Sequence, residues 1–398
     1  MKVSHILPYL PPKIGGRELW IRWMSPELVR RGIDLSIFAS NVKDYHKYSW
    51  RSEYERWPVR DNKPVRVYRA ATLYNNDRYS TPLVIPQFLK LIKERPDIVH
   101  LHEPNLAITT TLGIFAKIFF GSKMVLHCHS DAFRWKGLPR YLVPAMSLYQ
   151  LLYRFKLWLA DAVLAVSEEY VKSSPALMAV KDKVIVFPMS LAPTFRPLTS
   201  SANTSLRNKL KIPENRKIVL YVGRIDPRKG LDYLTDALLS LPNAFLIIVG
   251  SGDHDSTNAL KSKIADNRLS ERSLLVPTVM QEELNKYYNI ADVLCLPTND
   301  ITETFGVVLI EAWAVKKPVV VTDIPAPKRM VEGCGGGIVA RRMDAKDIAD
   351  KLRTILNDPE SARRMGEQGH DYVIKNFSFQ KLADRLVDIY SSILKEKR

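Results

Sequence analysis

Hydrophobic positions along the chain form short apolar runs, and between these runs apolar residues recur at helical spacing. Short apolar runs are typical of buried strands, and spacings of three and four residues are typical of amphipathic helices. In the first half this pattern predicts a helix over 17–31 and strands over 2–7, 34–39, 97–101, 123–127, 162–166 and 184–187. Such alternation predicts a parallel sheet covered by helices.

Residues 188–216 interrupt the alternation. They contain four prolines and the polar run 199–205, which are features of a linker or hinge. The alternation then restarts, with strands predicted over 218–222, 245–249, 274–276, 293–296 and 319–321. We therefore expect an α/β protein with two Rossmann-like domains, 1–190 and 191–375, and a C-terminal helix over 376–398. Open α/β sheets bind ligands at the carboxyl ends of their strands, so the expected site is a cleft between the two domains.

Composition agrees with two ordinary globular domains. The 398 residues are 46% hydrophobic and 25% charged, which excludes a disordered protein and a disulfide-stapled miniprotein. The 59 Lys and Arg residues against 42 Asp and Glu residues give a net charge of +17. Residues 1–190 carry 28 of the basic and 16 of the acidic residues. This excess indicates an anionic partner, whether nucleic acid, a phosphorylated small molecule or an acidic membrane.

Cysteine usage and the absence of long apolar stretches bear on localisation. The three cysteines, Cys128, Cys295 and Cys334, are odd in number and far apart, which favours buried thiols in a reducing cytosol over a disulfide framework. No window of 18 uncharged apolar residues occurs, and the first ten residues do not form a secretory signal. We therefore expect a cytoplasmic protein.

Two loops predicted to join a strand to a helix carry features that suit an anionic ligand. Gly15 and Gly16 precede the first helix, where free amide groups favour an anion, although the pair is equally compatible with a plain tight turn. Arg224 and Lys229 lie five residues apart in the loop 222–230 and can converge on a diphosphate. The alternative is a solvated charged turn, and the spacing is not that of a P-loop.

A third segment, 303–312, places two carboxylates around a predicted helix start. Glu303 lies in a polar loop, Gly306 opens the helix, and Glu311 falls two turns later among apolar neighbours. A helix start there would direct its amides at a phosphate or a sugar, while the carboxylates accept hydrogen bonds from hydroxyl groups. The alternative is a helix N-terminal charge and one surface acid, but the neighbours of Glu311 do not suit a solvated position.

Together, and in this order, the three segments resemble the retaining glycosyltransferases of family 4, which have the GT-B fold. The segments 100–105, 127–129 and 322–329 are most similar to the phosphatidylinositol mannosyltransferase branch. The resemblance implies a C-terminal helix that returns to the first domain. It also implies transfer of a hexosyl group from a nucleotide sugar, GDP-mannose first and a UDP-sugar second, to a lipid-linked or glycan acceptor.

The resemblance also implies roles for individual residues. Arg224 and Lys229 would hold the donor diphosphate, and Glu311 the ribose hydroxyls. The sugar and the distal phosphate would be held by Glu303 and the backbone of Phe305, Gly306 and Val307. His129 would meet the transferred sugar, and Gly15 and Gly16 would approach the donor phosphate and the acceptor. The chain departs from the family pattern at 324–327 and at Pro277.

Two sets of residues have the composition of metal sites. Four histidines lie at the ends of two predicted strands: His100, His102, His127 and His129. A zinc site would need all four to converge, and the resemblance accounts for His129 without one. Asp253 and Asp255 have the spacing of a manganese-diphosphate motif but follow a glycine-rich turn, which favours a solvated loop. Because Arg224 and Lys229 already supply positive charge, we expect front-face transfer with retention and no metal or other cofactor.

The acceptor surface is less defined by the sequence. Residues 133–141 and 149–158 mix basic and aromatic side chains, a composition that suits the edge of an anionic bilayer on the inner face of the cell membrane. Within the second segment, Tyr149, Leu152, Phe155 and Leu159 have helical spacing and are expected in the core. Two other classes stay open: a non-catalytic sugar-nucleotide-binding protein, and a basic nucleic-acid-binding protein, for which no motif is found.

Overall fold

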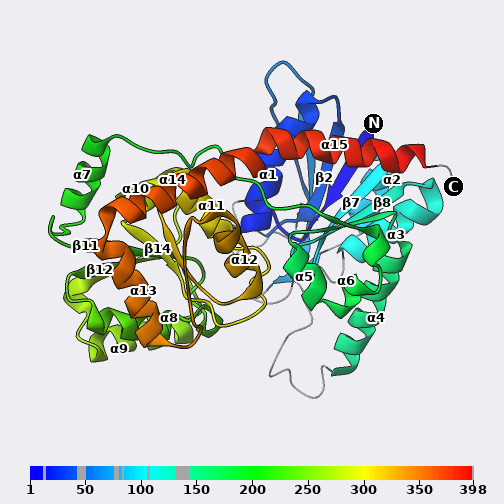
Figure 1. Cartoon of the computed structure of the whole chain (residues 1–398). Coiled ribbons are helices and arrows are strands. Elements are labelled where there is room, and N and C mark those ends of the chain that lie inside the picture. The colour runs from blue at the N-terminus through cyan, green and yellow to red at the C-terminus, as the bar shows by residue number, and fades with distance from the viewer. Residues whose placement is uncertain are drawn as a thin grey trace. The chain divides into compact units, whose positions relative to one another are not determined.

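The computed structural model describes residues 1–11, 15–42, 51–75, 80–82, 85–104, 108–130 and 143–396. The chain divides into two compact units (Figure 1), Met1–Ser190 with Phe379–Arg398, and Leu191–Ser378. Each unit is built around a largely parallel sheet with helices packed on it, so the predicted α/β class with two Rossmann-like domains is confirmed. No helix in the described ranges has the length and apolar character needed to span a bilayer.

The first unit contains an eight-stranded sheet in the order β10-β9-β8-β7-β1-β2-β4-β3. Its strands are β1 (Lys2–Ile6), β2 (Asp34–Ser40), β3 (Glu53–Trp57), β4 (Val65–Ala70), β7 (Ile98–Glu103), β8 (Lys123–Cys128), β9 (Ala162–Ala165) and β10 (Val184–Val186). All neighbours are parallel except β3 and β4, and β5 (Thr72–Asn75) pairs with β6 (Ser80–Pro82) in a separate ladder. The predicted central strands are therefore confirmed, whereas β3 to β6 were not predicted.

Helices cover both faces of this sheet. They are α1 (Gly16–Arg30), α2 (Ile85–Glu94), α3 (Ile108–Phe120), α4 (Val143–Leu159), α5 (Glu168–Ser173), α6 (Pro175–Met178) and α15 (Phe379–Lys395). The C-terminal helix α15 packs against α1 (Figure 1), and Arg31 pairs with Asp384 at 2.6 Å. The predicted return of the C-terminal helix to the first domain is confirmed. On the opposite face α3 approaches β7 closely, because Gly113 leaves room for Leu101.

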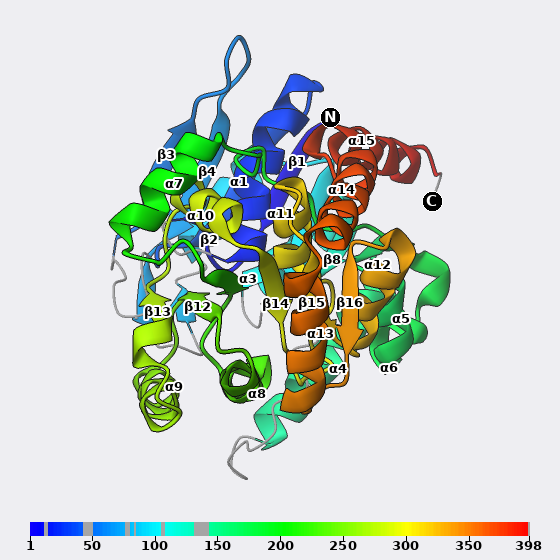
Figure 2. The same ribbon diagram turned by 60° about the vertical axis from the view of Figure 1, so that its left-hand side comes forward.

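The second unit has a six-stranded sheet in the order β13-β12-β11-β14-β15-β16 (Figure 2), and every neighbouring pair is parallel. Its strands are β11 (Lys217–Val222), β12 (Ala244–Val249), β13 (Ser273–Val276), β14 (Val293–Leu296), β15 (Val319–Thr322) and β16 (Gly337–Ala340). Its helices are α7 (Ser200–Lys209), α8 (Leu231–Ala237), α9 (His254–Asp266), α10 (Gln281–Ile290), α11 (Val307–Ala314), α12 (Pro325–Cys334), α13 (Ala345–Asn357) and α14 (Pro359–Asn376). Apolar side chains of α8, α9 and α13 form one continuous core with the sheet.

Two segments interpreted as loops are helical. The polar run 199–205 belongs largely to α7, whose first turn is capped by the Thr199 hydroxyl accepting from the Ala202 amide. Its serines and threonines look like linker residues, but Thr199 is a favourable N-cap and α7 packs on α10. Asp253 likewise caps α9 by accepting from the Ser256 amide at 2.7 Å, so the Asp-x-Asp segment is a helix start and not a solvated loop.

Candidate functional site

The second unit has a topological switch point between β11 and β14. From β11 the chain proceeds outward through β12 and β13 to one edge, and from β14 through β15 and β16 to the other. Ligands of open α/β sheets bind in the crevice outside the carboxyl ends of the strands at such a point. The loops that leave β11 and β14 there contain Arg224, Lys229 and Glu303, so the structure brings these three predicted site residues together.

The loop after β11 is held in shape by its own capping interactions. Asp226 caps the 3-10 turn Pro227–Lys229 by accepting from the Arg228 amide at 2.9 Å. The Tyr221 hydroxyl donates to the Arg224 carbonyl at 2.7 Å. Gly230 ends the turn with φ of +69°, and a Cβ atom there would lie 2.0 Å from the Pro297 carbonyl oxygen. Only glycine therefore fits where this loop meets the end of β14.

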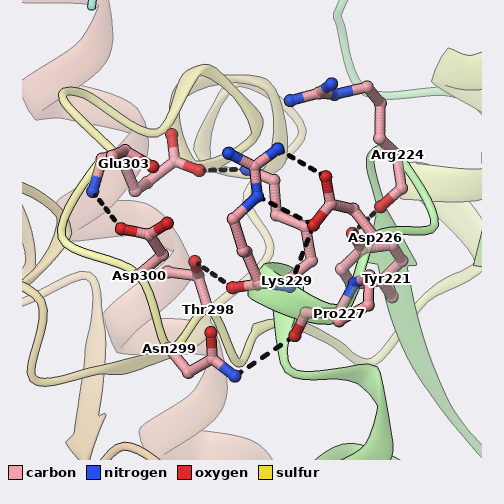
Figure 3. A network of polar contacts seen from close by, with 11 residues as sticks. Tyr221, Arg224, Asp226, Pro227, Lys229, Thr298, Asn299, Asp300 and Glu303 are labelled. Carbon is pink, nitrogen blue, oxygen red and sulfur yellow. Dashed lines mark hydrogen bonds and ion pairs between the residues drawn. The ribbon is translucent and has the colours of Figure 1, made fainter. Parts of the chain in front are cut away.

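The loop after β14 is joined to the first loop by three hydrogen bonds to backbone carbonyl groups (Figure 3). The Thr298 hydroxyl and the Asn299 amide both donate to the Arg228 carbonyl, at 3.1 Å and 3.0 Å. The Asn299 side-chain amide donates to the Pro227 carbonyl at 3.2 Å. Buried β15 supports this arrangement, because the Thr322 hydroxyl donates to the Thr298 carbonyl. The loops 223–230 and 297–306 are thus held together by hydrogen bonds, and we call this pair of loops the bracket. The charged side chains project from it.

Charges on this bracket are mostly paired. Lys229 forms an ion pair with Glu303 at 2.5 Å, with both side chains about one-fifth exposed. Arg228 makes a two-pronged contact with Asp226, and its hydrogen bonds lower the pKa of that carboxyl to about 2. Arg224 is exposed and extends away from the network in Figure 3, and within the described ranges its guanidinium has no partner. Arg224 is therefore the cation on the bracket that can take an anion without breaking a pair.

The start of α11 lies at the end of the second loop. Gly306 is the N-cap residue with φ of +87°, a left-handed conformation that favours glycine. Phe305 is buried and packs edge-on against Phe377, with ring centres 5.6 Å apart. The amide groups of Gly306 and Val307 have no hydrogen-bond partner in the part of the chain that the structure describes. These amides and the positive end of the helix can bind an anionic or hydroxyl ligand.

Glu311 is the fifth residue of α11, just over one turn from its start, and is 8% exposed, as its apolar neighbours predict. The Tyr288 hydroxyl of α10 donates to one of its carboxylate oxygens at 2.6 Å. Burial raises the pKa of Glu311 to about 7, and the hydrogen bond from Tyr288 acts in the opposite direction. Burial thus favours the protonated form of this carboxyl more than water does, and only the ionised form accepts hydrogen bonds at every lone pair.

The remaining predicted residues belong to the first unit. His129 follows β8, and its amide donates to the Glu103 carbonyl at 3.2 Å. Gly15 is the N-cap of α1 and Gly16 its first residue. The Glu18 carboxylate turns back onto this helix start, 2.3 Å from where a Cβ of Gly15 would lie, and Arg17 pairs with it at 2.9 Å. Residues 12–14 of the glycine loop, 105–107 and 131–142, which include the predicted aromatic-basic stretch 133–141, lie outside the described residues.

The histidines predicted at two strand ends are joined by a fifth. Two trios of imidazole nitrogens each lie within 4.8 Å of one another: His5, His100 and His102, and His102, His127 and His129. Several of these nitrogens already face one another at hydrogen-bonding distance: His5 Nδ1 lies 2.9 Å from His102 Nε2, and His102 Nδ1 lies 3.0 Å from His129 Nε2. A trio of this kind has the donor chemistry of a transition-metal site. The expectation of a metal-free reaction stays a prediction.

The expectation for α4 needs one correction. Tyr149 is buried as predicted, and Leu152 and Leu159 are half-buried, but Phe155 is 43% exposed. The buried stripe instead contains Tyr153, Lys156 and Leu157. Lys156 enters the core because its ammonium group pairs at 2.6 Å with Glu103, and both side chains are fully buried. The helical spacing predicted one buried stripe that included Phe155, whereas the sheet covers a neighbouring stripe of α4.

Sequence reasoning missed several residues that hold the predicted site residues in place. Asp226 could have been found, since an aspartate followed by proline is a common helix-start signal. Tyr288 and Thr298 carry no comparable signal, because their partners lie 23 and 70 positions away along the chain. His5 joins the predicted histidines only through the fold, which also places the Tyr390 hydroxyl 3.1 Å from His5 Nε2.

Comparison with known proteins gives matches to two family models. The model "Glycosyl transferase 4-like domain" matches residues 15–189, and "Glycosyl transferases group 1" matches residues 202–372. The chain is 25% identical over 408 residues to O-antigen chain mannosyltransferase C of Escherichia coli, with the whole of both chains covered. It is also 25% identical over 402 residues, 96% of each chain, to the GDP-mannose-dependent monoacylated alpha-(1-6)-phosphatidylinositol monomannoside mannosyltransferase of Corynebacterium glutamicum.

Solved structures share the fold over the whole chain. Sucrose-phosphate synthase from Thermosynechococcus elongatus superposes with a TM-score of 0.80 at 20% identity, and all of both chains is covered. HepE of Anabaena, in complex with UDP-glucose, gives 0.76 at 18% identity, covering 98% of this chain and all of the other. At these identities the likeness concerns the fold alone.

Proposed function

The chain belongs to the group 1 glycosyltransferases, family 4 of the retaining enzymes with the GT-B fold, and we propose that it transfers a mannosyl group from GDP-mannose to a lipid-linked or glycan acceptor. As a family member it is a hexosyltransferase. The choice of mannose rests on the names of two relatives, and a UDP-sugar is the second candidate donor. The observation that carries the proposal is the meeting of Arg224, Lys229 and Glu303 at the switch point of the second unit.

We assign nucleotide-sugar binding to the second unit. The exposed guanidinium of Arg224 and the ammonium group of Lys229 would bind the donor diphosphate, and the amides at Phe305, Gly306 and Val307 the sugar and the distal phosphate. Glu303 would orient the sugar hydroxyls. The Glu311 carboxylate would accept from the ribose hydroxyls at the buried end of the site.

Acceptor binding is assigned to the first unit. There His129 would meet the transferred sugar, and Gly15 and Gly16 would approach the donor phosphate and the acceptor. Closure of the two units about 188–216 stays a prediction.

The proposed reaction breaks the bond between the anomeric carbon and the diphosphate oxygen while the acceptor oxygen bonds to the same face of that carbon. The proton of the acceptor hydroxyl passes to the departing phosphate oxygen, so configuration is retained without a covalent intermediate. Charge on the leaving diphosphate grows as the sugar becomes oxocarbenium-like. Arg224, Lys229 and the positive end of α11 would stabilise that charge, which is the role a metal ion has in other transferases.

The ion pair between Lys229 and Glu303 allows the two roles to be separated. Lys229→Ala should weaken both nucleoside diphosphate binding and transfer, because it removes a cation from the diphosphate. Glu303→Gln releases Lys229 from its partner, so it should keep or raise nucleoside diphosphate affinity while transfer falls by about a hundredfold. A matched control is Lys263→Ala, since Lys263 pairs with Asp236 at 2.7 Å on the same unit.

The measurements are thermal stabilisation by GDP, UDP and their sugars, followed by transfer assays with the donor that stabilises most, with and without EDTA. A true donor stabilises the fold by mass action. Donor stabilisation without transfer or donor hydrolysis would favour the non-catalytic sugar-nucleotide-binding alternative. The site assignment would be refuted if Lys229→Ala and Glu303→Gln both behaved like Lys263→Ala.

The acceptor proposal is supported by exposed apolar side chains on the first unit. Leu148, Leu151, Phe155 and Trp158 form one stripe along α4, and Ile118 and Phe119 extend from the neighbouring α3. Leu151 and Trp158 are each 65% exposed, which is unusual for apolar side chains of this size. We infer that this face contacts the edge of an anionic bilayer on the cytoplasmic side, where a lipid-linked acceptor would be presented.

Vesicle co-sedimentation tests this inference. The chain should sediment with anionic vesicles at moderate salt and much less with zwitterionic ones. Replacing Leu151 and Trp158 with serine should abolish sedimentation, whereas Ile374→Ser, which removes an exposed apolar side chain from α14 in the second unit, should not. Equal sedimentation with both vesicle types, or no effect of the double variant, would contradict the inference.

A further inference from the structure

The sheet of the first unit has a topological switch point of its own, between β1 and β7. From β1 the chain proceeds outward through β2 to β4 and β3, and from β7 it proceeds through β8 and β9 to β10. The strands around this point are parallel, so their carboxyl ends lie at the same edge of the sheet. Open α/β sheets bind ligands at such an edge, so a ligand of the first unit is expected where β1, β7 and β8 end.

Arg17 spans this switch point. It is the second residue of α1, which follows β1, and its Nη1 atom donates to the carbonyl of Pro104, directly after β7, at 3.2 Å. Its Nε and Nη2 atoms donate to Glu18 Oε1 at 3.1 Å and 2.9 Å. Among the described residues the side chain makes only these three bonds, and a guanidinium group has five N–H groups. Two donors are therefore available to a ligand, and the side chain is only 16% exposed, so water competes little for them.

Glu18 provides an acceptor beside these donors. Its Oε1 atom accepts both bonds from Arg17, whereas its Oε2 atom has no hydrogen-bond partner in the described part of the chain. The Glu18 side chain is only 8% exposed. Leaving a buried carboxylate oxygen without a donor is costly, so Oε2 is suited to accept a hydrogen bond from a ligand.

Gly15 makes room for the Glu18 carboxylate. A Cβ atom at position 15 would lie 2.3 Å from Glu18 Oε2. The backbone of Gly15 is extended, with φ of −159°, so an alanine could adopt the same conformation without strain. The glycine is therefore required by the position of Glu18 and not by its own backbone conformation.

The charges at the switch point determine which class of ligand fits. The Arg17–Glu18 pair has a formal charge of zero, and the Glu18 carboxylate would repel a phosphate group that approached Arg17. A guanidinium N–H beside a carboxylate oxygen instead matches two neighbouring hydroxyl groups, one accepting and one donating. His129, at the end of β8, adds no charge. Burial lowers its pKa well below the ordinary value, and the charges of His127 and Arg17 act in the same direction.

We propose that Arg17 and Glu18 bind two neighbouring hydroxyl groups of the acceptor, which therefore presents a neutral polyol, such as a sugar ring, at the switch point of the first unit. The proposal rests on the assignment of acceptor binding to this unit under the proposed function. It names the groups of the acceptor that are recognised, whether or not the ring is linked to a lipid. It also makes Gly15 a positioning residue for Glu18.

Saturation-transfer NMR on the full-length protein tests the proposal without turnover, with methyl α-D-mannopyranoside as the probe. We expect the mannoside to bind the wild type and inorganic phosphate not to displace it. Arg17→Met and Glu18→Gln should each weaken binding about tenfold, because each removes hydrogen bonding by a charged group. The control is Arg30→Met, which removes the exposed partner of Glu27 from the same helix. No binding to the wild type, displacement by phosphate, or equal binding by all three variants would overturn the proposal.

Gly15→Ala tests the geometry of the pair while both charges stay in place. The added Cβ should displace Glu18 and weaken mannoside binding about as much as Glu18→Gln does, and wild-type binding by this variant would overturn the role given to Gly15 and Glu18.

Thermal stabilisation by the nucleotide-sugar donor separates this proposal from the proposed function. Because donor binding is assigned to the second unit, stabilisation should be the same in the wild type, Arg17→Met and Glu18→Gln. Weaker stabilisation in either variant would overturn the assignment of the pair to the acceptor. A wild type that binds the mannoside but is stabilised by no donor would contradict the proposed function, whereas the loss of mannoside binding in the variants would still support the pair.

Discussion

The buried carboxyl of Glu311 connects the stability of the second unit with its proposed nucleotide binding. The substitution Glu311→Gln tests this connection. Burial raises the pKa of this carboxyl from its ordinary value of 4.5 to about 7 in the folded chain. Each unit of pKa corresponds to about 1.4 kcal/mol, so keeping an ionised Glu311 in the fold costs about 3 kcal/mol. Glutamine cannot ionise, and it can still accept the hydrogen bond from Tyr288.

The sign of the pH dependence follows from linkage. A raised folded pKa stabilises the fold fully below pH 4.5, and that contribution is lost as the pH rises towards 7. The wild type should therefore lose up to about 3 kcal/mol over this range from Glu311, whereas Glu311→Gln loses nothing from this position. Relative to the wild type, the variant should gain most of that difference in free energy of unfolding between pH 5 and pH 8.

Urea unfolding at a series of pH values measures this difference, with Glu332→Gln, an exposed carboxylate on α12, as the control. Nucleoside diphosphate affinity should change in the opposite sense. The more stable Glu311→Gln protein should bind its nucleotide about tenfold more weakly, because an amide accepts fewer hydrogen bonds from the ribose than a carboxylate does. A stability difference that stays constant from pH 5 to pH 8 would refute the reasoning about Glu311.

Two further substitutions test the packing that supports the sites. Lys156→Met should destabilise the first unit by about 3–5 kcal/mol in urea unfolding, because it removes the ammonium group that pairs with the buried Glu103 carboxylate. Adding Glu103→Gln should recover part of that loss, and no recovery would contradict the ion-pair account. Gly230→Ala should weaken nucleotide binding about tenfold by calorimetry, since its Cβ would strike the Pro297 carbonyl at a positive φ. Gly333→Ala on α12, where nothing lies within 4 Å, should leave binding unchanged.

The central strands of both sheets could be predicted because they are buried on both faces and form continuous apolar runs. Strands β3 and β4 escaped prediction for the converse reason. β4 alternates buried and half-buried residues, and β3, at the edge, alternates half-buried and exposed ones, so charged and aromatic residues interrupt the apolar pattern. A strand with one face open to solvent can be recognised only when the strand that pairs with it is known. The antiparallel pairing of β3 with β4 is a tertiary property that no window of the sequence contains.

The parts of the candidate site that lie close together in the sequence could be predicted. Arg224 and Lys229 share one loop, and Glu303 and Glu311 flank one helix start, so their spacing carried the signal. Their partners come from other elements. The exposure of Phe155 could not be predicted for a related reason, since α4 has two apolar stripes and only the sheet decides which is covered.

The net charge of +17 says less about the proposed donor site than its size suggests. On the bracket of the second unit the cations Arg228 and Lys229 are neutralised by Asp226 and Glu303, and only Arg224 is left exposed without a partner among the described residues. A diphosphate would therefore meet a site that is nearly neutral, in which the Arg224 guanidinium and the amides of a helix start are accessible and the Lys229 ammonium group is shared with Glu303. Recognition there depends on the geometry of a few groups held at the switch point, and salt should affect it less than it affects binding to an anionic membrane.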